Sequence, residues 1–599
     1  MVETAKHPRK LSKRFKRALA VLFALFFAIS AGLIIYSRKI EPMVSARIKE
    51  AIYTATDGLY TISFSEIHLN PFTGTVRLDD IRFTANESVY FLMRKKGIQP
   101  THIYTIAVKS LALKHIHPIK VYFNKDLEIK TVHIDNPIIQ VSYRYPKNEK
   151  AEPEDKRTAW QRLSKYLKSI KIGEIVFDNI DFQYTDWSLG KPEIDGVKNM
   201  SVRIEDLLID SLSQNDKSRF YFTKEIFVRV RKHEYLSRDK MYTILFDDLK
   251  ISTSHRYAWA KGIQIIPRYG EMEYSKFLPT RKAQYKVDLN EVLLSNIDIK
   301  RLTDKRQLRA TSLNFMNADA SIFMDKSKAR PTYDRGWHFP QLALKRLRLN
   351  TLIDTVNVFN SSISYREYDP QTARAGKIFF NNVNGSVYNF TNDTLTLKKK
   401  KWIRARCTSR LFGKARLDFS MNFNLASEKE EYNYSGSLDS MNAKHFNQLS
   451  RPLALLKINS GKISKVNFSV NADYRKSSGK LLMYYRGLNI GLLRIDSGKV
   501  IHTQMLRSLV ANNLLLKEAN PSIGEKPRIG YINYTRPDSI AFFGSIWQSL
   551  YSGLRETMGL TPGREKKLKD QFKSLTNQNS NKGKLRKLKR SLRRQASKK

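Results

Sequence analysis

Apolar and polar residues alternate along most of this chain, which is the pattern of half-buried β-strands. Between residues 62 and 83, apolar side chains recur at every second position on both sides of an Asn, Pro and Gly cluster at 70–74. The alternation predicts strands, and the cluster predicts the hairpin turn between them. The same pattern recurs in 104–145 and, with few helical stretches, in 172–493. The chain is therefore predicted to be mainly β.

Three shorter segments have a helical period instead. Apolar residues lie on one stripe in 41–56 and in 160–170, and they recur at intervals of three and four in 542–558. Such spacing is typical of amphipathic helices. A charged, Pro-bearing stretch at 146–157 is predicted to be a loop or linker.

A loosely repeated unit occurs at 129–144, 172–186 and 347–367. Each copy has an apolar strand, a bend that contains Asn, Asp or Ser, and a second strand that ends near a Tyr. In the first copy the alternation shifts at Thr131 and at Asn136–Pro137, which indicates bulges or bends. The spacing between copies is irregular and does not predict a strict solenoid. Internal repetition and an ordinary large β-sandwich are both compatible with this pattern.

Residues 18–37 form a stretch of twenty residues without any charge. At about 1.5 Å per residue, a helix of this length matches the roughly 30 Å hydrocarbon core of a bilayer. We therefore predict a single transmembrane anchor. A cleaved signal peptide, with Ala28–Ser30 as its small-residue site, is the competing interpretation, but the apolar core is long for a signal. The predicted anchor residues are Leu19, Val21, Leu22, Phe23, Leu25, Phe26, Phe27, Leu33, Ile34 and Ile35.

Charge predicts the orientation of this anchor. The first seventeen residues hold seven Lys and Arg against one acidic residue, and the more positive flank of a membrane segment stays cytoplasmic. The bulk of the chain is then exported. Cys407 is the only cysteine, so no intramolecular disulfide can form, whereas a large exported eukaryotic ectodomain would usually hold several. We therefore expect a single-pass protein of the Gram-negative inner membrane, with its N-terminus cytoplasmic and its bulk periplasmic.

The chain is strongly basic, with 106 Lys and Arg against 56 Asp and Glu and a net charge of +50. Residues 1–17 contribute +6 and residues 564–599 contribute +13, so most of the excess lies between them. A body this basic repels itself unless it meets polyanions, for which nucleic acid, anionic lipid and anionic polysaccharide are the candidates. Export and the lack of zinc-finger or RNA-binding signatures argue against nucleic acid.

Beyond Thr561 the sequence is polar and basic. Leu585, Leu588 and Leu592 share one face among Lys and Arg, which fits a basic helix on an anionic membrane. The composition fits a disordered tail better.

A search for catalytic motifs finds no nucleophile elbow, metalloprotease motif, phosphate-binding loop or dinucleotide fingerprint. Cys407 stands in RARCTSR with no histidine nearby, which favours a partly buried thiol over a nucleophile. The chain is therefore not expected to be an enzyme, and no cofactor is predicted.

His115 and His117 are two positions apart on a predicted strand, and together with His133 they supply three imidazoles that could in principle bind zinc. No further His or acidic residue has a motif-like spacing, so surface histidines are the favoured interpretation and no metal site is predicted. Carboxylates at predicted strand ends or turns are explained by local hydrogen bonding, and no acid–base role is assigned to them. These carboxylates are Asp79, Asp80, Asp178 and Asp186.

Four stretches each resemble, in their order of strands and turns, a part of one known family, and the first of them follows the N-terminal anchor and a short helix. They are the strand pairs around the NPFTG turn in 54–83, the stretch KIFFNNVNGSVYNFTND at 377–393, the block 434–493 and the amphipathic segment 542–559. Together they resemble the AsmA-like superfamily of envelope proteins, which is related in architecture to chorein-type bridge lipid-transfer proteins. The resemblance covers most of 18–560 and rests on spacing and strand pattern.

This resemblance implies a long, curved, open antiparallel β-groove with a few short amphipathic helices, following the N-terminal transmembrane helix. Its apolar concave face would hold acyl chains while headgroups stay in water. The alternation agrees, because each strand has one apolar face and the sequence shows no evident second layer to cover it. About twenty to twenty-five strands spaced by about 4.8 Å would extend on the order of 100 Å. The predicted lining residues are Ile62, Phe64, Val76, Leu78, Ile139, Val141, Val466, Phe468 and Val470.

The expected function is lipid transport between membranes or a part in outer-membrane biogenesis. The expected partners are phospholipid or another anionic lipid, the membrane, and other envelope proteins. The alternative is a non-enzymatic envelope scaffold whose basic surface binds an acidic partner or polysaccharide. The predicted domains are a cytoplasmic basic tail (1–17), the anchor (18–37), an N-terminal AsmA-like β module (38–145), a linker with a short helix (146–171), the central and C-terminal β-groove (172–497), a closing segment with an amphipathic helix (498–560) and a basic tail (561–599).

Overall fold

The fold was analysed in a computed structural model of the chain. The structure describes residues 40–70, 73–117, 120, 123–144, 160–161, 164, 167–187, 192–496, 499–502 and 517–560. The predicted anchor at 18–37, the linker at 146–157 and the basic tail at 561–599 lie outside the described residues. Within the described residues, no helix is both long enough and apolar enough to span a bilayer.

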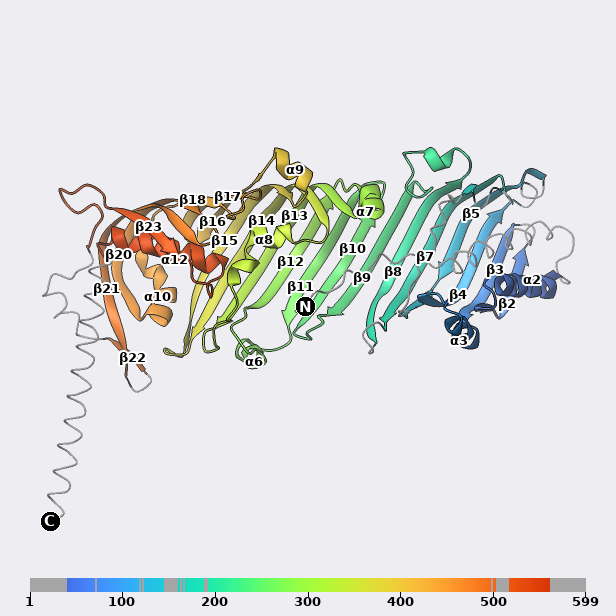
Figure 1. The fold of residues 1–599 in the computed structure, drawn as a ribbon, viewed down its shortest axis with the longest axis horizontal. Coiled ribbons are helices and arrows are strands. Elements are labelled where there is room, and N and C mark those ends of the chain that lie inside the picture. Colours follow the sequence, from blue (N-terminus) through green and yellow to red (C-terminus); the bar gives the residue numbers. More distant parts are fainter. Residues whose placement is uncertain are drawn as a thin grey trace, which may run out of the picture. The chain divides into compact units, whose positions relative to one another are not determined.

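The fold is mainly β, with 57% of the described residues in strands and 18% in helices, and the strands make up a large mixed sheet (Figure 1). The described part holds 23 strands, which agrees with the number expected from the sequence. The prediction of a purely antiparallel sheet is wrong, because β5 and β6 pair with β7 in parallel, as does β13 with β14. In each case a long crossover segment returns the chain to the end at which the previous strand began.

The chain divides into two compact units, of which the first comprises residues 1–235, 245–263 and 293–304. Its helices and strands are α2 (Ile40–Ala55), β1 (Tyr60–Ser63), β2 (Glu66–Asn70), β3 (Thr75–Ala85), α3 (Glu87–Lys95), β4 (His102–Ile116), β5 (Asp126–Asp135), β6 (Ile138–Tyr143), β7 (Ser169–Asp186), β8 (Glu193–Ile209) and η1 (Ser213–Asn215). Elements that contribute residues to both units are β9 (Glu225–Leu236), β10 (Tyr242–Ser252), β11 (Tyr257–Pro267), β12 (Gln284–Ser295) and α7 (Ile299–Lys305).

The second unit comprises residues 236–244, 264–292 and 305–599. Its strands are β13 (Gln307–Asp325), β14 (Asn350–Asp369), β15 (Arg374–Thr391), β16 (Trp402–Leu411), β17 (Ala415–Asn424), β18 (Tyr432–Leu438), β19 (Met441–Asn442), β20 (Leu456–Ala472), β21 (Lys476–Asp496), β22 (Lys499–His502) and β23 (Ile529–Thr535). Its helices are α6 (Glu271–Lys276), η2 (Arg335–His338), α8 (Pro340–Lys345), α9 (Thr394–Lys399), η3 (Ala443–Phe446), α10 (Asn447–Ala454) and α12 (Phe542–Thr557).

Two of the three predicted helices are confirmed with nearly the expected bounds, as α2 and α12. The helix predicted to reach Ile170 ends earlier, because Ser169 and Ile170 already belong to β7. Ile170 pairs with Leu127 of β5 and with Ile209 of β8. Backbone pairing with a strand on each side therefore makes Ser169 and Ile170 part of a strand, although the sequence has a helical period here.

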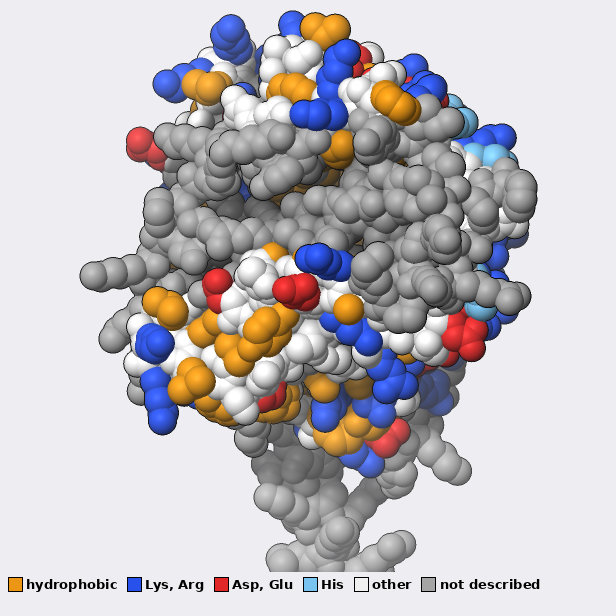
Figure 2. All heavy atoms as spheres, turned by 90° about the vertical axis from the view of Figure 1, so that its right-hand side faces the viewer, with side chains coloured by type: hydrophobic (Ala, Val, Ile, Leu, Met, Phe, Trp, Pro, Cys, Tyr) orange, Lys and Arg blue, Asp and Glu red, His pale blue; other side chains and the backbone are white. Residues whose placement is uncertain are grey.

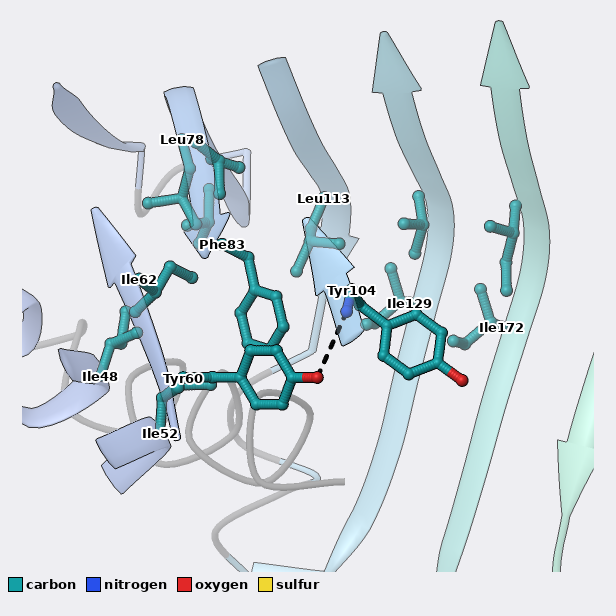
Figure 3. Packing of buried hydrophobic residues seen from close by; sticks show 14 of the residues in the cluster. Ile48, Ile52, Tyr60, Ile62, Leu78, Phe83, Tyr104, Leu113, Ile129 and Ile172 are labelled. Atoms are coloured by element: carbon teal, nitrogen blue, oxygen red, sulfur yellow. Dashed lines mark hydrogen bonds between the residues drawn. The ribbon is translucent and has the colours of Figure 1, made fainter. Parts of the chain in front are cut away.

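The hydrophobic core of the first unit lies between α2 and the first strands (Figure 3). Ile48 and Ile52 of α2 are buried against a cluster that includes Leu78. The rings of Tyr60 and Phe83 stack with centroids 4.6 Å apart. Alternating apolar residues in β1 and β3 thus point to one side, and the apolar stripe of α2 covers that side.

Asparagines in the left-handed backbone region account for the bends predicted within the repeated unit. Asn136 separates β5 from β6, whereas Asn179 and Asn360 lie inside β7 and β14 and shift their registers. Asn tolerates positive φ better than most residues because its short polar side chain can bond locally. The side chain of Asn360 donates to Asn317 Oδ1 at 2.9 Å. The bends predicted at Asn136 and in the second and third copies are confirmed, but the one predicted at Thr131 is wrong, because β5 keeps a single register with β4 and β7 through this residue. In the second and third copies the two predicted strands are one continuous bulged strand.

A buried ion pair connects the segment before α12 to the rest of the second unit. Arg536, whose side chain is 1% exposed, lies 2.9 Å from Asp334 Oδ1. Its guanidinium lies over the rings of Phe339 and Tyr474, 5.2 and 4.8 Å from their centroids. The Tyr474 hydroxyl donates to Asp334 Oδ2 at 2.8 Å. This cluster joins the segment before α8, the β20–β21 turn and the segment that leads into α12.

The ionisation of Asp334 makes this cluster sensitive to acid. Partial burial opposes ionisation, but hydrogen bonds from Arg536, the Gly336 N–H and Tyr474 outweigh burial and lower the pKa of Asp334 from 3.8 to about 2. Because the folded pKa is the lower one, the stabilisation is full above about pH 4 and is lost as the pH falls towards 2. After allowance for solvent screening, we expect a loss of about 1–2 kcal/mol over this range.

Unfolding titrations of the wild-type chain and of Asp334→Asn between neutral pH and pH 2 measure this contribution. The variant should lack this part of the pH dependence, so the difference in stability between the two proteins should shrink in acid. A difference that stays constant down to pH 2 would contradict the assignment.

Candidate functional site

The sheet of the second unit has one polar and one apolar face, and the register of its strands defines both. One row of paired residues is polar across seven strands. Its members are Asn314, Asn357, Ser386, Arg406, Ser420, Ser435 and Ser469.

The apolar face consists of the two rows on either side of that polar row, because successive residues of a strand point to opposite sides. The first row is Val356, Val387, Ala405, Met421, Tyr434 and Val470. The second row is Val358, Gly385, Cys407, Phe419, Gly436, Phe468 and Leu481. On β13, Leu313 and Phe315 extend these rows by pairing with Val356 and Val358.

Side chains on the polar face form hydrogen bonds with side chains of the neighbouring strands. Asn357 donates to Asn314 Oδ1 at 2.8 Å and accepts from the Ser386 hydroxyl at 2.7 Å. The hydroxyls of Ser420 and Ser435 lie 2.8 Å apart. Cross-strand bonds of this kind stabilise the sheet without any covering layer. The polar face can therefore remain in water.

Helix α12 covers the β18–β23 end of the apolar face (Figure 1). The hydroxyl of Ser549 bonds to the hydroxyl of Tyr434, and both residues are fully buried. Gly553 lies so close to the sheet that a Cβ atom at Gly530 would be 1.9 Å from its carbonyl oxygen. Only glycine permits this approach. The sequence-based expectation that no second layer covers the strands is therefore wrong at this end, where Val470 is 1% exposed.

The same face is covered less completely towards β14 and β13. The side chains of Leu313, Phe315, Val356 and Val358 are all partly exposed, and the buried cluster beneath α12 does not include them. Val387 and Phe419 pack against the edge of that cluster. The apolar face thus continues from a dry core into a surface that water can reach.

Lysines lie beside this surface. Lys398, Lys399, Lys400 and Lys401 follow one another at the end of α9, in the connection from β15 to β16, and all four are exposed. Phe390, on the β15 side of this connection, packs against the buried cluster, and Ile403, on the β16 side, belongs to it. A cationic edge therefore borders the apolar face at this strand end.

The nine residues predicted to line a groove fall into two places. Ile62, Val76, Leu78 and Val141 are buried in the core of the first unit, and Phe64 and Ile139 pack against it. Val466, Phe468 and Val470 lie in the second unit beneath or beside α12. Phe64 also borders a cleft of about 380 Å³ with Ser45, Lys49 and His68. A role of these residues in binding acyl chains stays a prediction.

Sequence reasoning missed the partly exposed residues on β13 to β16. The alternation of apolar residues in Val356, Val358 and Val387 was a usable signal, but the pattern alone does not show which apolar positions lack a cover. That difference depends on where α12, α8 and α10 pack.

Cys407 lies on the apolar face and is partly buried, as expected. Burial, together with the charge of Asp418, raises the pKa of its thiol. The reactive thiolate is therefore disfavoured, and the thiol acts as a small apolar side chain.

The histidines and aspartates singled out from the sequence make local contacts. His133 Nε2 lies 2.8 Å from Asp178 Oδ2, and Arg77 Nε donates to Asp79 Oδ1 at 2.9 Å. The aspartates at 79 and 80 lie inside β3, whereas a strand end or turn was predicted. Among the residues that the structure describes, no three His, Cys, Asp or Glu side chains are grouped so that they could hold a metal ion.

Basic side chains are also spread over the surface of the first unit. Figure 2, which views the side of α2 and β2, shows Lys and Arg distributed among hydrophobic side chains, with fewer acidic ones. This distribution accords with the net charge of +50. Comparison with models of known protein families and with curated proteins gave no match.

Proposed function

We propose that this protein binds the acyl chains of lipids on the apolar face of its second unit, and that it carries lipid between the membranes of a Gram-negative envelope or takes part in outer-membrane biogenesis without covalent chemistry. One observation carries the proposal. The sheet has a continuous apolar face that is buried under α12 at one end and partly exposed from β13 to β16, while the side chains of the opposite, polar face hydrogen-bond to one another. A contiguous apolar surface that water can reach is typical of binding sites.

The physical chemistry of a lipid suits this surface. Burying an acyl chain is worth roughly 0.8 kcal/mol per methylene group. The side chains of Leu313, Phe315, Val356 and Val358 have no hydrogen-bonding group that would oppose it. The headgroup can stay in water at the strand ends. There, the exposed lysines at 398–401 would attract a phosphate as hydrated point charges.

Mass spectrometry of lipids that copurify with the full chain tests this function. Wild-type protein should hold phospholipid or another anionic lipid in stoichiometric amounts. Val358→Asp should lose most of it, because a carboxylate on the apolar face must be desolvated when an acyl chain packs there. Phe359→Asp is the matched control, since Phe359 is the next residue, is 45% exposed and belongs to the opposite face.

Retention of lipid by Phe359→Asp, together with its loss in Val358→Asp, would support the proposal. A folded wild-type chain without any bound lipid would contradict it. That result would favour the alternative of an envelope scaffold that binds an acidic partner or polysaccharide through its basic surface.

A further inference from the structure

Helix α12 presents small residues to the sheet and large aromatic residues to the outside. Ser545, Ser549, Gly553 and Thr557 recur at every fourth position and are all buried. On the other side, an aromatic stripe consists of Phe543, Trp547 and Tyr551, which are 77%, 38% and 37% exposed. Phe542 is also buried, and Ile546, Leu550 and Leu554 pack against the core. The aromatic stripe is therefore additional apolar surface, on the side of the helix where a water-facing helix normally has polar residues.

A cationic side chain lies next to the aromatic stripe. The rings of Trp547 and Tyr551 stack with centroids 6.2 Å apart and an interplanar angle of 22°. The guanidinium of Arg555 lies over the ring of Tyr551 at 5.1 Å. The acidic neighbour Glu556 is engaged elsewhere, since it accepts a hydrogen bond from the Tyr531 N–H at 2.7 Å. The exposed side of α12 is therefore aromatic, and the partly exposed Arg555 lies at one end of it.

This combination fits the interface between lipid headgroups and hydrocarbon. Trp and Tyr favour that depth because they have an apolar body and a polar tip, and Arg pairs with phosphate there. The sequence that follows α12 adds charge of the same sign, with fifteen Lys and Arg against two acidic residues in 564–599. Basic residues next to an interfacial helix strengthen binding to anionic lipid.

We propose that the aromatic stripe of α12 docks this protein on the surface of an anionic bilayer. The proposal goes beyond acyl-chain binding, because the docking residues lie on the side of α12 that faces away from the apolar face. It places a bilayer at the helix that closes one end of that face.

Collisional quenching by lipid-borne probes tests the docking. The full chain is prepared in a Cys407→Ala background, and a fluorophore is attached at Gln548→Cys, an exposed position on α12. The protein is reconstituted into vesicles that contain about one-third phosphatidylglycerol and a small fraction of doxyl-labelled lipid. We expect about twofold quenching at this position, and less in vesicles of phosphatidylcholine alone or at high salt.

Two controls test whether the quenching depends on the aromatic stripe. A fluorophore at Met272→Cys, an exposed apolar position on α6 between Glu271 and Glu273, should be quenched little. The triple variant Phe543→Ser, Trp547→Ser and Tyr551→Ser should lose the quenching at residue 548, whereas Tyr531→Ser, which removes an exposed ring outside α12, should not.

Equal quenching at residues 548 and 272, or full quenching in the triple variant, would overturn the proposal. Because the stripe is exposed, the triple variant should unfold at the wild-type temperature and keep its bound lipid. The two proposals can therefore fail separately. A wild-type chain that holds lipid but is not quenched would contradict docking alone, and one that is quenched but holds no lipid would contradict acyl-chain binding alone.

Discussion

Replacing Val470 with Asp should lower the free energy of unfolding of the second unit by about 3–5 kcal/mol, whereas the same replacement at Val356 should cost about 1 kcal/mol. The two valines lie in the same row of the apolar face and have the same chemistry. Val470 is 1% exposed beneath α12, next to Tyr434. A carboxylate there must be desolvated or protonated, while one at the partly exposed Val356 can reach water.

Urea titrations of the full chain, followed by tryptophan fluorescence, measure the two effects. Ser469→Asp is the matched control, because this exposed residue precedes Val470 and belongs to the polar face. It should change the midpoint little. Wild-type stability in Val470→Asp would show that α12 does not exclude water from this part of the sheet. A loss of stability in Val356→Asp equal to that in Val470→Asp would show that the whole apolar face is a dry core.

This pair of valines also shows what the sequence could predict. The alternation correctly predicts that Val356 and Val470 point to an apolar face, because a two-residue period is a local property of a strand. Local spacing likewise predicts α2, α12 and the hairpin at 70–74 within one or two residues. The bends at Asn136, Asn179 and Asn360 were also foreseeable, since a break in alternation and a residue that tolerates positive φ coincide there.

The cover of each apolar position could not be predicted in the same way. Ser549 and Gly553 let α12 approach the sheet closely, but Ser549 is 115 residues away in sequence from Tyr434, the strand residue to which it bonds. The parallel pairing of β13 with β14 likewise depends on the route of the segment between them. Which residues form core and which form an open surface is therefore decided by tertiary packing, and the predicted lining residues fell mainly in the core.

Replacing Arg536 with Met should destabilise the second unit by about 3 kcal/mol. The side chain is 1% exposed and its charge is balanced by Asp334 at 2.9 Å. Without it, Arg475, at 3.2 Å, is the one ion-pair partner that Asp334 keeps among the described residues, and the backbone carbonyl of Tyr474 loses the Nε–H of Arg536. Arg536→Lys should recover part of the loss, because it restores the charge but not the planar fork.

Arg475→Met is the matched control for this prediction. Arg475 contacts the same carboxylate, but its side chain is 48% exposed, and exposed ion pairs contribute about 0–1 kcal/mol. A double-mutant cycle with Asp334→Asn then separates the ion pair from the packing of Arg536 on Phe339 and Tyr474. The double variant should lose less stability than the sum of the single losses, and strict additivity would mean that packing of the guanidinium, not its charge, fixes the start of α12.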